Sequence, residues 1–139
     1  MSGKCFVDTN ILIYAHNRAA GEKHRRAVAL IQQLWVSNEG VLSTQVLQEF
    51  CFNVRRKVAQ PLSINDTARV LQQYLHWEVL INPPISAVDA MALESRYQIS
   101  FWDALILTAA QAAGVSTLYS EDFSHGQFYG SVRVVNPFQ

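Results

Sequence analysis

The stretch that decides the fold is Cys5-Phe6-Val7-Asp8-Thr9-Asn10, near the start of the 139-residue chain. Cys5 to Val7 has the pattern of a short buried strand, and it runs directly into Asp8. A second apolar run, Ile11 to Ala15, follows at once and predicts the opening of a helix. Aspartate is an ordinary turn residue, but an aspartate between a buried strand and another apolar run is uncommon. The position of Asp8 therefore favours a functional role.

The rest of the chain alternates predicted strands with predicted helices. Thr44 is expected to cap one helix, and Ser63, Ser86 and Ser100 each stand three residues before an aspartate, which resembles a capping box. The expected strands are 41–43, 77–81, 115–119 and 132–135, and the expected helices include 22–35, 45–58 and 100–114. This alternation predicts an α/β fold, a three-layer α/β/α sandwich around a mostly parallel sheet. The length suits a single domain, residues 1–139.

Four acidic residues stand where predicted strands end or predicted helices begin: Asp8, Glu49, Asp103 and Asp122. Because parallel α/β sheets bind ligands beyond the carboxyl ends of their strands, we expect these side chains to meet at one edge. Carboxylates gathered there repel each other by about 3 kcal/mol per pair, at about 5 Å and an effective dielectric of about 20. Mg²⁺ or Mn²⁺, which prefer carboxylate oxygen, would offset that repulsion. The pattern predicts metal-assisted phosphate chemistry.

Each of these acids also has a simpler interpretation. Glu49 could be a solvated helix residue, and Asp103 could only cap its helix and favour the helix dipole. Phe101 and Trp102 beside Asp103 suggest instead a packed, partly buried turn. Glu121 competes with Asp122 for the same place, and the triplet alone does not choose between them. The joint placement of the acids is a stronger signal than any one of them.

The composition gives the chain no overall attraction for nucleic acid, because its net charge is zero. Any such contact must come from local basic clusters, Lys23 to Arg26 and Arg55 to Lys57, of which Arg56 shares a helix stripe with Glu49. Only 16% of residues are charged, against about 25% in a typical domain, which favours a surface hidden against a copy or a partner. The sequence shows no signal peptide and no long apolar span, so we expect a cytoplasmic protein. Because the two cysteines lack CxxC spacing, we expect them to be buried and reduced.

Other chemistries fit the sequence less well. The four histidines lack HxxxH or HxH spacing, and no glycine-rich nucleotide loop is present. Serine hydrolysis lacks a histidine and oxyanion context. A phosphotransfer receiver domain needs a late lysine, but none follows Lys57. An aspartate-nucleophile phosphatase needs Asp-x-Asp, and Asn10 stands at the third position.

Several motifs together resemble the PIN domain, and especially PIN-domain ribonuclease toxins of the VapC type. The resemblance spans essentially the whole chain and is carried by Val7-Asp8-Thr9-Asn10-Ile11, by Glu49 after Ser43-Thr44, by Ser100-Phe-Trp-Asp103-Ala-Leu-Ile106, by Leu118-Tyr-Ser-Glu-Asp122-Phe123, and by the ending Val134-Val-Asn-Pro-Phe138.

The resemblance implies an Mg²⁺- or Mn²⁺-dependent endoribonuclease, the toxin of a toxin–antitoxin pair. Family members of this kind cut RNA, pair with a small antitoxin and form homodimers. The acidic positions of the family fall on Asp8, Glu49, Asp103 and Asp122, so the resemblance favours Asp122 over Glu121. Asn10 and Ser120 match supporting polar positions. Two alternatives stay open: a non-toxin PIN-domain nuclease acting on other nucleic acid, DNA included, and a non-catalytic PIN-like binding module.

Overall fold

A six-stranded sheet forms the centre of the computed structural model, which describes residues 3–139. The strands are β1 (Cys5–Val7), β2 (Gly40–Ser43), β3 (Glu78–Leu80), β4 (Thr117–Tyr119), β5 (Phe128–Tyr129) and β6 (Val132–Val135). Their spatial order is β3-β2-β1-β4-β6-β5. All neighbours pair in parallel except β5, which runs antiparallel to β6. Because β1 lies between β2 and β4, the chain segments that follow these three strands meet at one edge of the sheet.

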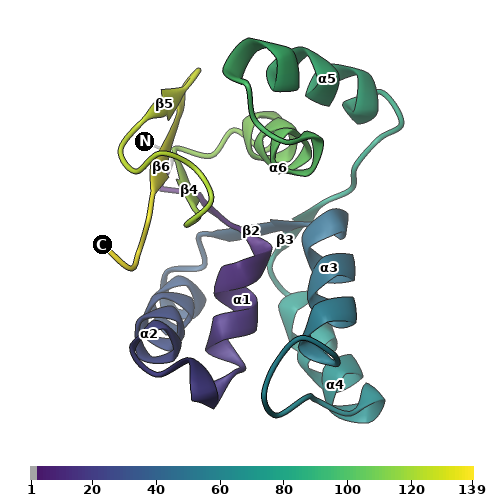
Figure 1. The fold of residues 1–139 in the computed structure, drawn as a ribbon, viewed down its shortest axis with the longest axis vertical. Helices are drawn as coiled ribbons and strands as arrows, with labels where there is room; N and C mark the ends of the chain where they lie inside the picture. Colours follow the sequence, from purple (N-terminus) through teal and green to yellow (C-terminus); the bar gives the residue numbers. More distant parts are fainter. Residues whose placement is uncertain (1–2) are drawn as a thin grey trace.

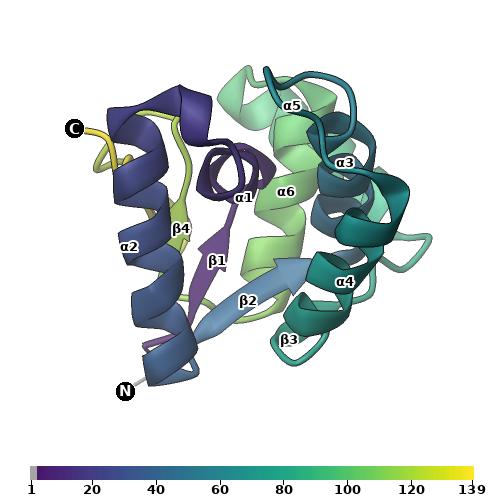
Figure 2. The same cartoon turned by 90° about the horizontal axis from the view of Figure 1, so that it is seen from below.

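Helices cover both faces of this sheet, which confirms the predicted three-layer α/β fold (Figure 1). They are α1 (Thr9–Ala15), α2 (Glu22–Ser37), α3 (Thr44–Val54), α4 (Ile64–Tyr74), α5 (Ser86–Tyr97) and α6 (Phe101–Ala112), with a short 3-10 helix η1 (Arg18–Ala20) after α1. Helices α5 and α6 lie on one side of the sheet and α1 to α4 on the other (Figure 1). Seen from below, α1 lies between α2 and α3, and it packs against both (Figure 2).

The core lies on both faces of the central strands. Phe6, Leu42 and Leu118, from β1, β2 and β4, have no exposed surface. The stripe predicted for α2 is buried as expected at Ala27, Leu30, Ile31 and Leu34, whereas Trp35, predicted on the same face, is 40% exposed at its border. Burial of the strands is what holds their carboxyl ends, and the side chains that follow, in place.

Helix boundaries differ from the sequence prediction around α1 and α3. Helix α1 begins at Thr9, earlier than expected, because Asp8 caps it by accepting a hydrogen bond from the Thr9 backbone N–H. Ser43 rather than Thr44 caps α3, since the Ser43 hydroxyl accepts from the backbone of Val46. Helix α3 ends at Val54, where the prediction ran to Val58, because the backbone turns there.

Helix α5 begins at Ser86 as expected, although Ser86 does not cap it, and the caps predicted for α4 and α6 are confirmed. The hydroxyl of Ser86 donates to the carbonyl of Pro83 and makes no cap hydrogen bond. Ser63 and Ser100 each accept a backbone hydrogen bond from the aspartate three residues later. The sequence reasoning missed η1 and the two-residue strand β5, which are too short to show a period.

The two cysteines, Cys5 and Cys51, are free, but each is half-buried where the sequence predicted full burial. Within residues 3–139, no helix combines the length and the apolar character needed to cross a bilayer.

Candidate active site

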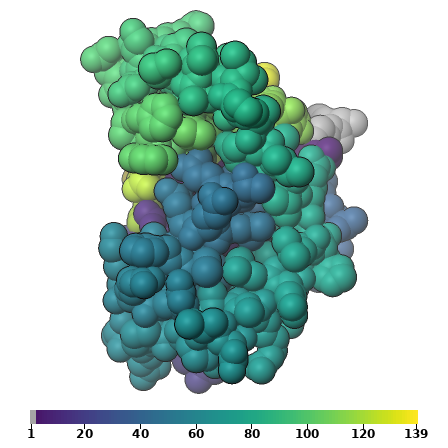
Figure 3. Space-filling view, turned by 90° about the vertical axis from the view of Figure 1, so that its right-hand side faces the viewer, coloured from purple at the N-terminus to yellow at the C-terminus, as the bar shows by residue number. Residues whose placement is uncertain are grey.

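The acidic residues line a hollow at the carboxyl ends of β1, β2 and β4. The hollow encloses about 130 Å³ and is lined by Asp8, Glu49, Asp103 and Asp122 together with Thr9, Asn10, Gln45, Asn53, Trp102 and Ile106. It lies where the chain leaves β1 toward one side of the sheet and β4 toward the other, which is the usual ligand position in such sheets. In the space-filling view, purple N-terminal atoms and yellow atoms from the C-terminal part of the chain reach the surface side by side, between green and blue segments (Figure 3).

Three of the four carboxylates stand at the distance that a single ion requires. Asp8, Asp103 and Asp122 each offer an oxygen, and these oxygens lie within 4.8 Å of one another. Oxygen ligands of hard divalent cations stand about 2.0 to 2.6 Å from the ion, so two of them are at most about 5 Å apart. In the part of the chain that the structure describes, no other group of three or more acidic, histidine or cysteine side chains meets this condition.

Asp8 is the buried member of the group. Its Oδ1 accepts a 2.7 Å hydrogen bond from the backbone of Thr9, and its Oδ2 accepts a 2.7 Å hydrogen bond from the hydroxyl of Ser120. Burial raises the pKa of Asp8 to about 7, against the two hydrogen bonds that lower it, and the charges of Asp122 and Asp103 raise it further. Near neutral pH this carboxyl therefore stands close to the loss of its proton.

Asp103 and Asp122 are more accessible, and their surroundings favour the protonated forms less strongly. Burial is the main cause that raises the pKa of each, and the charge of Asp122 adds to the effect on Asp103. Asp122 is anchored from two sides: its backbone N–H donates to the Ser120 hydroxyl at 3.0 Å, and Asn10 Nδ2 donates to its Oδ2 at 3.2 Å. Asn10 and Ser120, the polar residues expected to support the acids, thus contact them directly.

Glu121 contacts Tyr14 and Lys23 and is not among the residues that line the hollow, whereas Asp122 lines it. The Glu121 carboxylate accepts a 2.6 Å hydrogen bond from the hydroxyl of Tyr14 and pairs with Lys23 Nζ at 2.8 Å. Lys23 belongs to the first predicted basic cluster, and this ion pair joins the start of α2 to the loop after β4. Adjacent residues of that loop therefore have separate roles, one structural and one in the hollow.

Glu49 lines the hollow but lies outside the group of three. Its Oε1 accepts a 2.7 Å hydrogen bond from the Thr9 hydroxyl, and its Oε2 accepts a 3.5 Å hydrogen bond from Gln45 Nε2. Sequence reasoning did not single out Thr9 or Gln45 as site residues. The available signals were the adjacency of Thr9 to Asp8 and the spacing of Gln45, one helical turn before Glu49.

Arg56, predicted to support the site, is not among the residues that line the hollow. It follows the end of α3 at Val54, so the helical stripe that was to align it with Glu49 does not extend that far. Its guanidinium carbon lies 4.3 Å from the ring centroid of Phe52, in a cation–π pair. The turn after α3 therefore directs this cation onto an aromatic ring.

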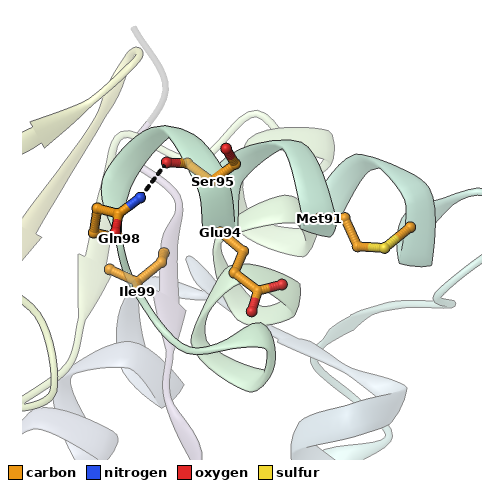
Figure 4. Close-up of a pocket in the computed structure, with 5 residues that line it drawn as sticks. All are labelled: Met91, Glu94, Ser95, Gln98 and Ile99. Atoms are coloured by element: carbon orange, nitrogen blue, oxygen red, sulfur yellow. Dashed lines mark hydrogen bonds between the residues drawn. The ribbon is translucent and has the colours of Figure 1, made fainter.

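A larger hollow elsewhere lacks comparable chemistry. It encloses about 410 Å³ near the end of α5 and is lined by Met91, Glu94, Ser95, Gln98 and Ile99 (Figure 4). The amide of Gln98 turns back to the carbonyl of Ser95 at 2.8 Å, and Glu94 is the one acidic residue in this lining (Figure 4). The converging carboxylates, rather than size, therefore distinguish the smaller hollow as the candidate site.

The sequence profile of the PIN domain matches residues 5–129, which is most of the chain and includes all four acids. The chain belongs to the PIN domain family. The family resemblance and the fold class predicted from the motifs are thereby confirmed. None of the curated proteins matches the sequence.

Solved structures of VapC toxins and of toxin–antitoxin complexes share the fold of this PIN domain. VapC20 of Mycobacterium tuberculosis, described as a sarcin-ricin loop cleaving toxin, is 22% identical with a TM-score of 0.67, over 86% of this chain and 90% of that one. A toxin–antitoxin complex from Klebsiella pneumoniae is 20% identical with a TM-score of 0.70, over 96% and 98%. VapBC2 of Rickettsia felis, bound to a promoter DNA fragment, is 21% identical with a TM-score of 0.58, over 84% and 85%.

The hollow of this PIN domain fits a hard divalent cation. Its donors are carboxylate oxygens, and burial together with the neighbouring acids raises the pKa of Asp8, as expected for acids held together without charge compensation. The volume of about 130 Å³ equals that of about four water molecules in the liquid, which suffices for a partly hydrated ion.

Proposed function

We propose that this PIN domain is a divalent-cation-dependent endoribonuclease of the cytoplasm and the toxin of a type II toxin–antitoxin pair. The observation that carries the proposal is the group of Asp8, Asp103 and Asp122, whose oxygens lie within 4.8 Å of one another. The family match supports a nuclease. The structural likeness to a sarcin-ricin loop cleaving toxin and to a toxin–antitoxin complex supports the finer statement.

Asp8, Asp103 and Asp122 would hold the cation, Mg²⁺ or Mn²⁺, with Glu49 completing the site or contributing to a second one. When bound there, the ion supplies a water of lowered pKa and offsets charge on the phosphate group of the substrate. Hydrolysis by water leaves a 5′-phosphate and a 3′-hydroxyl and does not need the ribose 2′-hydroxyl. The catalytic residues in this proposal are therefore the four acids.

The neighbouring side chains keep these acids in place. The Ser120 hydroxyl donates to Asp8, which favours its charged form against the effect of burial, and it accepts from the backbone of Asp122. Asn10 donates to the side chain of Asp122, which also lines the hollow. Thr9 and Gln45 fix Glu49 in the same way.

The test is cleavage of purified RNA by the purified protein with Mn²⁺ and with excess EDTA. We expect cleavage only with the cation, and none from Asp8→Asn or Asp103→Asn proteins that fold normally. Asp89→Asn is the matched control, because Asp89 also lies in the first turn of a helix but faces solvent. Cleavage by the wild type in EDTA would contradict the proposal. DNA competitors that block cleavage as well as RNA would favour the alternative of a nuclease with another substrate.

The proposed partners are a small antitoxin and a second copy of the chain. An antitoxin would insert a basic side chain among the acids, so co-expression with the product of a neighbouring short reading frame should inhibit cleavage. A co-purifying partner that leaves cleavage unchanged would remove this part of the proposal. The low fraction of charged residues, 16%, supports a homodimer. Light scattering on the purified protein gives the oligomeric state.

A further inference from the structure

A large aromatic ring is exposed at the rim of the acidic hollow. Trp102 lines the hollow and is 63% exposed, although the sequence suggested that it belongs to a packed turn. Ile106 is the other apolar residue of the lining, and it is only 2% exposed. Trp102 therefore supplies the accessible apolar surface among the described residues that line the hollow.

The position of Trp102 is fixed by its neighbours. Its backbone carbonyl accepts a 3.3 Å hydrogen bond from Nε2 of Gln45, which also donates to Glu49. Its ring meets that of Phe101 edge to face, with the centroids 5.3 Å apart. Asp103, one of the three clustered acids, is the next residue. A flat ring thus stands directly beside the carboxylates, on backbone that is hydrogen-bonded to a residue of the same hollow.

We infer that Trp102 is a stacking platform for an unpaired nucleobase of the RNA, next to the phosphate that lies over the acids. This inference rests on the proposed function and specifies the form of its substrate. Trp102 borders the hollow that the four acids line, so a base stacked on its exposed ring would lie beside a phosphate held over those acids. Aromatic side chains bind splayed-out bases by stacking, and every base offers a flat face.

The surroundings of Trp102 favour a nucleotide over a protein side chain as its occupant. Aromatic anchors of protein interfaces stand in apolar patches whose neighbours exclude water. Here the lining around Trp102 is mostly carboxylate, amide and hydroxyl, and an apolar protein surface anchored on the ring would desolvate those acids without compensating their charge. A nucleotide presents a flat base beside a charged phosphate, which a cation over the acids can receive. Because the two faces of a base are covered in a duplex, the platform selects single strands.

The experiment compares probes that differ only in the base. All proteins carry Asp8→Asn to prevent cleavage, and their affinities are measured by anisotropy in Mg²⁺ for three fluorescein-labelled RNAs: a ten-nucleotide adenosine strand, an abasic strand of the same length and a ten-base-pair duplex. We expect Trp102→Leu to weaken binding of the adenosine strand by about 5- to 100-fold and to leave the other two unchanged. Trp102→Phe keeps an aromatic face and should retain most of the affinity.

Phe128→Leu is the matched control, because Phe128 on β5 is also 63% exposed but does not line the hollow. This change should leave all three affinities as they are. Quenching of tryptophan emission by the adenosine strand provides a second readout, which the Trp102→Leu protein should largely lose. Circular dichroism and the melting temperature check that each variant is folded.

The outcomes separate this inference from the proposed function. If the wild type cleaves RNA but Trp102→Leu leaves the affinity for the adenosine strand unchanged, the platform is overturned and the nuclease stands. Equal losses for adenosine and abasic strands would also overturn it, since the ring would then act on the backbone. Loss of dimers or of a protein partner with unchanged RNA binding would assign the ring to a protein contact. Failure of the wild type to cleave RNA, together with failure of the Asp8→Asn protein to bind the adenosine strand, would remove both proposals.

Discussion

The hydroxyl of Ser120 donates a 2.7 Å hydrogen bond to Oδ2 of Asp8 and so joins the ends of two neighbouring strands. The same hydroxyl oxygen accepts from the backbone N–H of Asp122 at 3.0 Å. One buried hydroxyl therefore sets the separation of two acids that come from opposite ends of the chain. It also favours the charged form of Asp8, against the burial that raises its pKa.

Replacing Ser120 by alanine should weaken cation binding. Without the hydroxyl, the pKa of Asp8 rises further, so a larger fraction is protonated at pH 7 and must lose its proton before Mn²⁺ binds. A hydrogen bond to a charged group contributes about 1.5 to 3 kcal/mol, which corresponds to an affinity loss of about 10- to 100-fold. Calorimetry with Mn²⁺ at pH 6, 7 and 8 measures the loss, which should be largest at pH 6. Ser116→Ala, at an exposed hydroxyl near the other ends of the strands, should bind Mn²⁺ normally.

The stability of the metal-free protein should fall as pH rises from about 4 to about 7. The pKa of Asp8 is raised to about 7 in the fold from its ordinary value of 3.8, so the folded state holds a proton that the unfolded state releases in this window. The unfolded state then binds fewer protons, and the free energy of unfolding decreases with pH. The contribution of Asp8 is on the order of 4 kcal/mol.

Denaturation in EDTA tests this pH dependence, with Asp8→Asn as the reference. The variant lacks the titrating group, so it should match the wild type near pH 4 and exceed it in stability at pH 8. Added Mn²⁺ should stabilise the wild type more at pH 8 than at pH 5, because the ion competes with protons for the same oxygens. An Asp8→Asn protein that is less stable than the wild type at pH 8 in EDTA would refute the assignment.

Glu121→Gln should mainly lower stability and Asp122→Asn should mainly lower Mn²⁺ affinity, although the two residues are adjacent. Asp122→Asn removes an oxygen of the three-acid group and should reduce Mn²⁺ affinity by at least about tenfold and abolish cleavage. Glu121→Gln weakens the contacts with Tyr14 and Lys23 and should lower the free energy of unfolding by about 1 kcal/mol, with Mn²⁺ affinity within about threefold of the wild type. A pair of titrations and melts separates the two roles, and equal losses of Mn²⁺ affinity would argue that both carboxylates face the ion.

Thr9 should matter for cleavage through Glu49. Thr9→Val keeps the backbone N–H that binds Asp8 but removes the hydroxyl that donates to Glu49 at 2.7 Å. We expect cleavage to fall about tenfold, in proportion to one lost charged hydrogen bond, with the first Mn²⁺ bound normally because Glu49 lies outside the group of three. Thr9→Ser, which restores the hydroxyl, should recover cleavage. A loss of the first Mn²⁺ site in Thr9→Val would place Glu49 among the ligands of that ion instead.

Local patterns predicted most of the elements and misplaced some of their ends. Helix and strand periods follow from which face is buried, and Ser63 and Ser100 were read correctly because a cap needs only the next three residues. Ser86 has the same spacing to Asp89, but its hydroxyl donates to the carbonyl of Pro83 in the turn before the helix. Arg56 lost its predicted alignment with Glu49 because the backbone turns after Val54.

The order of residues along the chain by itself determined the alternation of strands and helices, the parallel sheet and the family, since each depends on residue types at fixed spacings. It also placed Asp8, Asp103 and Asp122 beyond strand ends or at a helix start. Only the tertiary structure decided that oxygens of these three acids lie within 4.8 Å of one another, that Glu49 accepts a hydrogen bond from Thr9, and that Glu121 pairs with Lys23. It also decided that the ring of Trp102 stays open to solvent. These relationships depend on how separate elements cross and pack, because side chains as distant in sequence as Asp8 and Ser120 come within hydrogen-bonding distance only after the sheet has brought their strands together.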